Sequence, residues 1–133
     1  MSNKKPKLKT YEELMEQMPE MVIWNTGTYY REETPEMTEA ARLRTLKVIG
    51  YELKFFQDNG LTTRILCESA PDIPEKFVVR LHDITEEALD FLRGGHRKWL
   101  ARLDRNRFSD PADVRILERE LAKLRQAKAV EEK

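Results

Sequence analysis

The sequence is poor in the residue types from which most catalytic and metal sites are built. Its 133 residues include one cysteine and two histidines, and its serines are Ser2, Ser69 and Ser109. A single cysteine excludes an internal disulfide framework and is typical of a reducing compartment. The five glycines form neither a phosphate-binding loop nor a dinucleotide fingerprint, and no HExxH or paired CxxC motif is present. We therefore expect no enzymatic activity, no metal and no cofactor.

Long apolar runs and net charge are also missing. No apolar run approaches the roughly 18 residues that a membrane-spanning helix needs. The first ten residues, MSNKKPKLKT, lack the apolar core of a signal peptide. We therefore expect a cytoplasmic protein with no membrane contact. Lysine and arginine balance aspartate and glutamate, 24 against 24, so the chain as a whole offers no electrostatic reason to bind DNA.

The strongest pattern in the sequence predicts a long central helix from Thr34 to Gly60. Thr34 is a cap residue, and Pro35 after it suits the first helical position, where its missing N–H costs nothing. Thr38 is an alternative cap, one turn later. Asn59 and Gly60 predict a left-handed end to the helix.

Apolar residues follow two stripes along this helix. One stripe contains Leu46, Ile49, Leu53 and Phe56. The other contains Met37, Ala41, Val48 and Phe55. A surface helix normally shows one stripe, so two stripes predict a helix packed on two sides. Gly50 costs about 1 kcal/mol relative to alanine inside a helix, so we expect a neighbouring backbone to approach it closely.

Shorter patterns before and after the central helix predict one helix and up to three strands. A capping box at residues 10–13 predicts a helix that ends near Met18. Residues 21–30 are rich in β-branched and aromatic side chains, which favours a strand or a tight hairpin with short arms. Residues 61–67 and 77–81 predict further strands, so a sheet of two or three strands is expected.

The C-terminal part predicts two helices in an antiparallel hairpin. The first begins after Asp83 or Thr85 and runs to about Asp104, with a possible kink at Gly94-Gly95. The second begins after the cap at residues 109–111, and the short connection makes the helices antiparallel. The fold class is therefore α+β and mainly helical. The expected organisation is a disordered basic tail at 1–9, one domain at 10–127 and a frayed tail at 128–133.

Charge is distributed unevenly along this neutral chain. Residues 11–40 carry eight glutamates and one arginine, a net charge of −7, whereas residues 93–108 carry six basic residues and one aspartate, a net charge of +5. The two blocks either are solvated faces that neutralise each other across the fold, or one of them is a docking surface. Aromatic side chains, which suit buried interface anchors, lie within the acidic block. The candidate partner-binding residues are Trp24, Tyr29, Tyr30, Glu32, Glu33 and Glu36.

The basic block suggests an alternative function, association with nucleic acid. The candidate polyanion-binding residues are Arg93, Arg97, Lys98 and Arg102. The spacing of Trp99 places it in the core, where it cannot stack on a base. His96 lies on an apolar helix face, so we expect a hydrogen-bonded, partly buried side chain there and not a base or a metal ligand. Cys67 is expected to be a small core residue.

The layout resembles the small cytoplasmic immunity-type proteins that are encoded beside bacterial secreted-toxin genes. The resemblance rests on TPEMTEAARLRTL at 34–46, NGLTTR at 59–64 and the segment from Trp99-Leu100 to DVRILE at 113–118, and it covers residues 10–127. It implies a non-enzymatic inhibitor that binds and occludes one cognate toxin. It assigns no functional residue. A monomer and a homodimer, formed through an exposed helix face, are both compatible with each of the functions considered.

Overall fold

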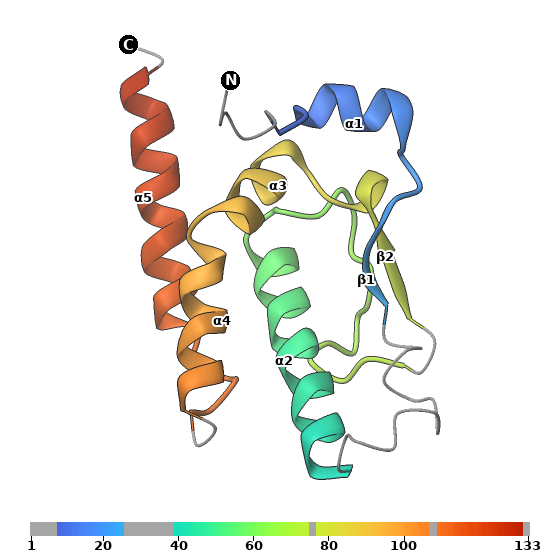
Figure 1. Cartoon of the computed structure of the whole chain (residues 1–133), viewed down its shortest axis with the longest axis vertical. Helices are drawn as coiled ribbons and strands as arrows, with labels where there is room; N and C mark the ends of the chain where they lie inside the picture. The colour runs from blue at the N-terminus through green and yellow to red at the C-terminus, as the bar shows by residue number, and fades with distance from the viewer. Residues whose placement is uncertain (1–7, 26–38, 75–76, 107–108, 132–133) are drawn as a thin grey trace, which may run out of the picture.

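The chain forms a mainly helical α+β fold around one central helix (Figure 1). The computed structural model describes residues 8–25, 39–74, 77–106 and 109–131. The central helix, α2 (Glu39–Asp58), lies between a helical hairpin and a two-stranded sheet. Two shorter helices, α1 (Tyr11–Gln17) and α3 (Glu86–Arg93), close one end of this arrangement. The predicted fold class is confirmed.

Local signals in the sequence define the start of α1 and the end of α2. The Thr10 hydroxyl accepts the N–H of Glu13 at 3.1 Å, and the Glu13 carboxylate accepts the N–H of Thr10 at 3.3 Å, so the predicted capping box is confirmed. Gly60 adopts a φ of 70°, which confirms the predicted left-handed end of α2. The predicted start of α2 at Thr34 or Thr38 lies outside the described residues.

Helix α2 is buried on two sides, as its two stripes predict. Leu53 and Phe56 of the first stripe are fully buried, and Phe55 of the second is 4% exposed. A Cβ placed on Gly50 would collide with the carbonyl oxygen of Pro71, so the expected close backbone approach is present. The core continues from α2 into the other elements through a cluster that includes Leu14, Leu61, Val79, Leu81, Ile84, Phe91, Trp99, Leu117 and Leu121.

The sheet has two antiparallel strands, β1 (Val22–Asn25) and β2 (Val78–Arg80), with a bulge between Val22 and Trp24. The strand predicted at 21–30 is therefore present at its start, and its remainder lies outside the described residues.

The strand predicted at 61–67 is wrong. This segment contributes only one isolated bridge, between Thr62 and Ile84. The side-chain oxygen of Gln57 accepts the N–H groups of Leu66 and Cys67 at 2.7 and 2.8 Å. The Gln57 amide nitrogen donates to the Cys67 carbonyl at 3.0 Å. Backbone groups that a sheet would have paired are satisfied by one side chain of α2.

The single helix predicted from residue 83 or 85 to Asp104 is also wrong, because α3 ends at Arg93 and a separate helix, α4 (His96–Arg105), follows. Gly94 leaves the helical region, with φ −127° and ψ −111°. A Cβ on Gly95 would lie 2.5 Å from the Cβ of Glu120, so the second glycine admits a neighbouring helix. The expected kink is a complete break.

The cap of α3 is Thr85, the alternative that the sequence offered. Its hydroxyl accepts the N–H of Ala88 at 3.1 Å. Asp83 instead accepts the N–H of Arg80 at 2.9 Å and forms an ion pair with Arg64 at 3.1 Å. Asp83 thereby joins the end of β2 to the loop after α2.

Helix α5 (Arg115–Glu131) packs antiparallel to α4, which confirms the predicted hairpin (Figure 1). It begins four residues after the predicted cap at 109–111, where the Asp113 carboxylate accepts the N–H of Arg115 at 3.2 Å. It continues to Glu131, beyond residue 127, where we expected the folded domain to end.

We predict that Gly50→Ala lowers the free energy of unfolding by about 1–3 kcal/mol, because the added methyl group collides with a main-chain oxygen that has little room to move. Urea denaturation followed by circular dichroism measures the change. Lys47→Ala, at an exposed position of the same helix, is the control and should stay within about 0.5 kcal/mol of the unaltered protein. Equal stability of the two variants would contradict the prediction.

Candidate functional site

The predicted acidic and aromatic surface is represented in the structure by Trp24 and by α1. The other candidate contacts, Tyr29, Tyr30, Glu32, Glu33 and Glu36, lie outside the described residues. Glu12, Glu13 and Glu16 of α1 are exposed, and so is Glu20, which follows this helix. Glu20 lies 3.3 Å from the imidazole of His82 and 3.7 Å from the guanidinium of Arg80.

Trp24 is half-buried on β1, and one side of its ring contacts Phe56. Its ring and that of Phe56 meet edge to face, with centroids 5.1 Å apart and planes at 77°. Phe56 is fully buried on α2, so this contact fixes the orientation of the tryptophan. Trp24 therefore presents a partly exposed aromatic surface that is already oriented.

The predicted basic face is divided between two helices. Arg93 belongs to α3, and its guanidinium donates to the main-chain oxygen of Lys9 at 2.7 Å. Arg97, Lys98 and Arg102 are exposed on α4. The structure therefore brings three of the four candidate residues onto one helix and turns Arg93 toward the N-terminal segment.

Glu120 of α5 is the point on which cations of both hairpin helices converge. Its side chain is 6% exposed, and Lys98 of α4 lies 3.0 Å from its Oε1 atom. Lys123 and Arg119 lie 3.2 and 3.6 Å from Oε2, although neither makes a well-directed hydrogen bond with that atom. The hydrogen bond from Lys98, with a smaller contribution from Lys123, lowers the pKa of Glu120, whereas burial opposes this effect.

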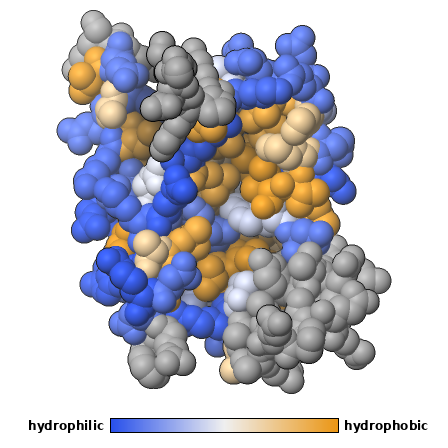
Figure 2. Space-filling view, in the orientation of Figure 1, coloured by the Kyte–Doolittle hydropathy of each residue, from blue (hydrophilic) through white to orange (hydrophobic). Residues whose placement is uncertain are grey.

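A cleft of about 540 Å³ opens between β1, α2 and α4, and we call it the Glu52 cleft. Its walls include the apolar residues Ile23, Trp24, Val48, Ile49, Leu100 and Leu103. Its ionisable lining residues are Arg44, Glu52, His96 and Asp104. On the face drawn in Figure 2, apolar residues gather in the middle of the molecule, the region occupied by these elements in Figure 1.

A buried pair of ionisable side chains, Glu52 and His96, lines this cleft. Nε2 of His96 lies 2.5 Å from Oε2 of Glu52, and the two side chains are 5% and 4% exposed. The prediction that His96 is hydrogen-bonded is confirmed, and the residue is more deeply buried than expected. Sequence reasoning missed Glu52. Its spacing from Ile49 and Phe56 places it on the first apolar stripe, and a charge on such a stripe was the available signal.

The surroundings of His96 explain its orientation. Its ring lies 5.9 Å from those of Phe56 and Phe91 and 6.1 Å from that of Trp99, measured between centroids. A histidine hydrogen-bonded to a carboxylate has the arrangement of a general base and its orienting partner. Here aromatic rings surround the histidine, and the pair links α2 to α4 and lines the cleft.

Arg44 also lines the cleft, and it binds the end of α4. Its guanidinium donates to the main-chain oxygen of Ser109 at 3.0 Å and lies 3.5 Å from those of Leu103 and Asn106. These oxygens include carbonyls that a helix end leaves without intrahelical partners. The guanidinium therefore stabilises the C-terminal end of α4 and is held there.

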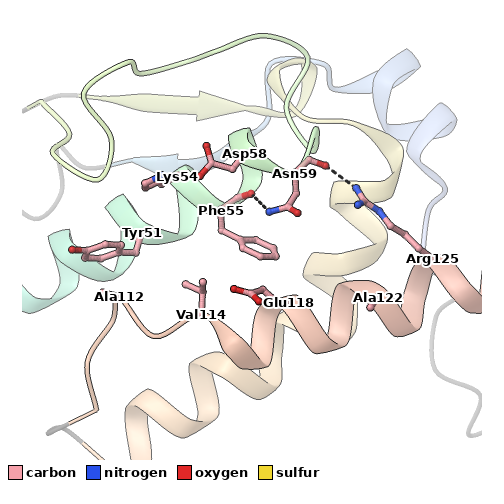
Figure 3. Close-up of a pocket in the computed structure, with 10 residues that line it drawn as sticks. All are labelled: Tyr51, Lys54, Phe55, Asp58, Asn59, Ala112, Val114, Glu118, Ala122 and Arg125. Atoms are coloured by element: carbon pink, nitrogen blue, oxygen red, sulfur yellow. Dashed lines mark hydrogen bonds and ion pairs between the residues drawn. The ribbon is translucent and has the colours of Figure 1, made fainter.

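A second concavity, of about 590 Å³, lies between α2 and α5. Figure 3 shows Phe55 pointing from α2 toward α5, with Val114 and Glu118 on the opposite wall. One end is closed by Arg125, whose guanidinium donates to the Asn59 carbonyl at 2.7 Å. We call it the α2–α5 groove; it contains no buried ionisable pair among its described lining residues.

Comparison with known proteins gives no function for the Glu52 cleft or for the α2–α5 groove. No protein-family model, curated protein or solved structure matches the chain. Within the described ranges, no three histidine, cysteine, aspartate or glutamate side chains come together in a way that could hold a metal ion. Over the same ranges, none of the helices combines the length and the apolar character that crossing a membrane requires. The function must therefore be inferred from the charge and shape of the surfaces.

We predict that Glu120→Gln destabilises the protein by about 1 kcal/mol at pH 7, a modest value because the cations around it are exposed. The pKa of Glu120 is lower in the folded protein than its ordinary value of 4.5. The stabilisation is therefore present above that ordinary value and is lost as the pH falls through the folded-state pKa.

Denaturation at a series of pH values from neutral to strongly acidic tests this dependence. The difference between the unaltered protein and Glu120→Gln should shrink toward acid pH. Glu118→Gln, at an exposed position of the same helix, should show little difference at any pH. A Glu120→Gln difference that does not change with pH would contradict the role of the charge.

Proposed function

We propose that this chain is a non-enzymatic binding protein, an inhibitor of the immunity type that occludes a cognate bacterial toxin. In this proposal the partner meets Trp24 together with the acidic segment that follows β1 in sequence. The partner surface is basic, as the nucleic-acid-binding cleft of a nuclease would be. Opposite charges guide the encounter, and the aromatic side chains supply most of the affinity.

The observation that carries this proposal is the position of Trp24. Its ring is oriented by Phe56 and remains partly exposed at the Glu52 cleft. Aromatic anchors that are oriented before binding lose little conformational entropy in the complex. The exposed glutamates of α1 precede β1 directly in the chain, so the acidic character expected for residues 11–40 is present on described residues as well.

The test begins with purification of the tagged full-length protein from its native host after nuclease treatment, followed by mass spectrometry. A single stoichiometric protein partner, encoded beside this chain, is the expected result. Trp24→Ala should then weaken the measured affinity about 30-fold or more, because truncation of a buried aromatic anchor costs at least about 2 kcal/mol. Ile65→Ala, at a side chain that is 65% exposed, is the matched control and should leave the affinity unchanged.

Charge reversal tests the electrostatic half of the proposal on the same complex. Glu32→Lys combined with Glu33→Lys should slow association and reduce its dependence on salt. Glu118→Lys combined with Glu131→Lys makes the same change of net charge on α5 and should have little effect. Equal behaviour of the two double variants would remove the acidic segment from the interface.

The second candidate function is association with a polyanion through the α4–α5 hairpin. One observation favours it: Arg119 and Lys123 of α5 lie close to Glu120, as Lys98 of α4 does. The basic face thus extends beyond the residues that the sequence suggested. Only one buried carboxylate lies among these three cations.

If this candidate function is correct, the purified protein should bind single- or double-stranded nucleic acid at low salt, and the affinity should fall steeply as salt increases. Arg97→Gln and Arg102→Gln should reduce the salt dependence, because each removes a cation that would neutralise a phosphate. Electrophoretic mobility shifts at two salt concentrations measure this. No shift of any nucleic acid at low salt would exclude the candidate.

A further inference from the structure

The Glu52 cleft combines the volume of a ligand site with a buried carboxylate. Its 540 Å³ lies within the roughly 300–1,000 Å³ typical of small-molecule pockets. Five of its twelve lining residues are aliphatic and come from three elements, and Trp24 adds an aromatic face. Such walls suit an apolar ring or stem, and the few polar groups of the lining determine which head group can enter.

The ionisable groups of the lining favour a cationic head group. The Arg44 guanidinium is held by main-chain oxygens at the end of α4, through its Nη1 and Nη2 atoms. Within the described part of the chain, the ion-pair contact of Glu52 is with His96 and not with a lysine or arginine. Asp104 adds a second carboxylate to the lining. The lining therefore presents two carboxylates, Glu52 and Asp104, against one guanidinium that is bound at the end of α4.

The burial of Glu52 needs a compensating group. An ionised carboxylate removed from water is costly unless it is paired and hydrogen-bonded. His96 is hydrogen-bonded to one oxygen of Glu52, Oε2, and both residues line the cleft. A cation that entered along the apolar walls would meet this carboxylate and compensate its charge, while its ring or stem would cover apolar surface that is now open to the cleft.

We propose that the Glu52 cleft binds an organic cation, an amidinium, guanidinium or ammonium group carried on an apolar ring or stem. The cation contacts the carboxylate of Glu52, and the ring or stem lies along the aliphatic walls beside Trp24. This chemistry occurs in small amidines and amines and also in an arginine side chain of another protein. The inference goes beyond the proposed inhibitory function, because binding of the cation alone requires no toxin.

The test titrates the ¹⁵N-labelled full-length protein with three probes and follows the indole N–H signals of its two tryptophans by NMR. Trp24→Phe assigns the Trp24 signal. Benzamidine and N-acetylarginine amide carry the cation on a ring and on a stem, and benzoate is a ring of similar size with the opposite charge. We expect saturable shifts of the Trp24 signal with a dissociation constant on the order of 1 mM for the better cation, and none with benzoate.

Two variants and one control locate the binding. Glu52→Gln keeps the shape and a hydrogen bond to His96 but removes the charge, and it should weaken cation binding about ten-fold or more. Val48→Phe narrows the cleft while the carboxylate of Glu52 stays in the sequence, and it should abolish binding even if Glu52→Gln fails to fold. Glu118→Gln removes a carboxylate from the α2–α5 groove and should leave the affinity unchanged.

The relative affinities of the two cationic probes distinguish the two sources of the cation, and three results would contradict the proposal. Tighter binding of N-acetylarginine amide points to a protein side chain, whereas tighter binding of benzamidine points to a small ring-bearing molecule. The proposal is wrong if benzoate binds as well as the cations, if Glu118→Gln loses binding while Glu52→Gln keeps it, or if neither cation shifts the Trp24 signal. Because no partner protein is present, such a failure would leave the capture experiment for the proposed inhibitor unaffected.

Discussion

Phe56 of α2 contacts an aromatic ring from each of three other elements, and the rest of the structure depends on these contacts. Its centroid lies 5.1 Å from Trp24 of β1 and 5.9 Å from both Phe91 of α3 and His96 of α4. A two-stranded sheet is marginally stable by itself, and so are helices of eight and ten residues. These elements become stable because α2 offers each of them an apolar surface, and both its faces are used.

The parts of the fold that were predicted correctly depend on neighbours in sequence. Thr10 and Glu13 cap the same helix, and Asn59-Gly60 ends the helix to which it belongs. The errors occur where a distant side chain intervenes. Gln57 bonds the backbone groups of Leu66 and Cys67, and Glu120 packs against Gly95 at the break before α4. A pattern of apolar residues contains no information about which distant polar group will satisfy a backbone.

In the candidate sites too, local features were predicted and contacts between distant residues were not. The hydrogen bond of His96 was predicted from its apolar face, but its partner 44 residues away was not. Among the described residues, Lys98 of the basic block pairs with Glu120 of the adjacent helix, a carboxylate that lies outside the acidic block at 11–40. Trp24 is the predicted partner-binding residue that the structure describes, and it lies at a cleft that the sequence did not reveal.

The sheet that carries Trp24 is assembled from segments far apart in the chain, with Val22 paired to Arg80. The α4–α5 hairpin, by contrast, joins neighbours. Closing the long loop between the strands has an entropic cost that four- and three-residue strands offset only in part. Local opening should therefore begin at β1, before the helical hairpin separates from α2. A molecule bound against Trp24 would bind only the conformation in which β1 and β2 are paired. Its binding would therefore stabilise the pairing of the two strands at the ends of this loop.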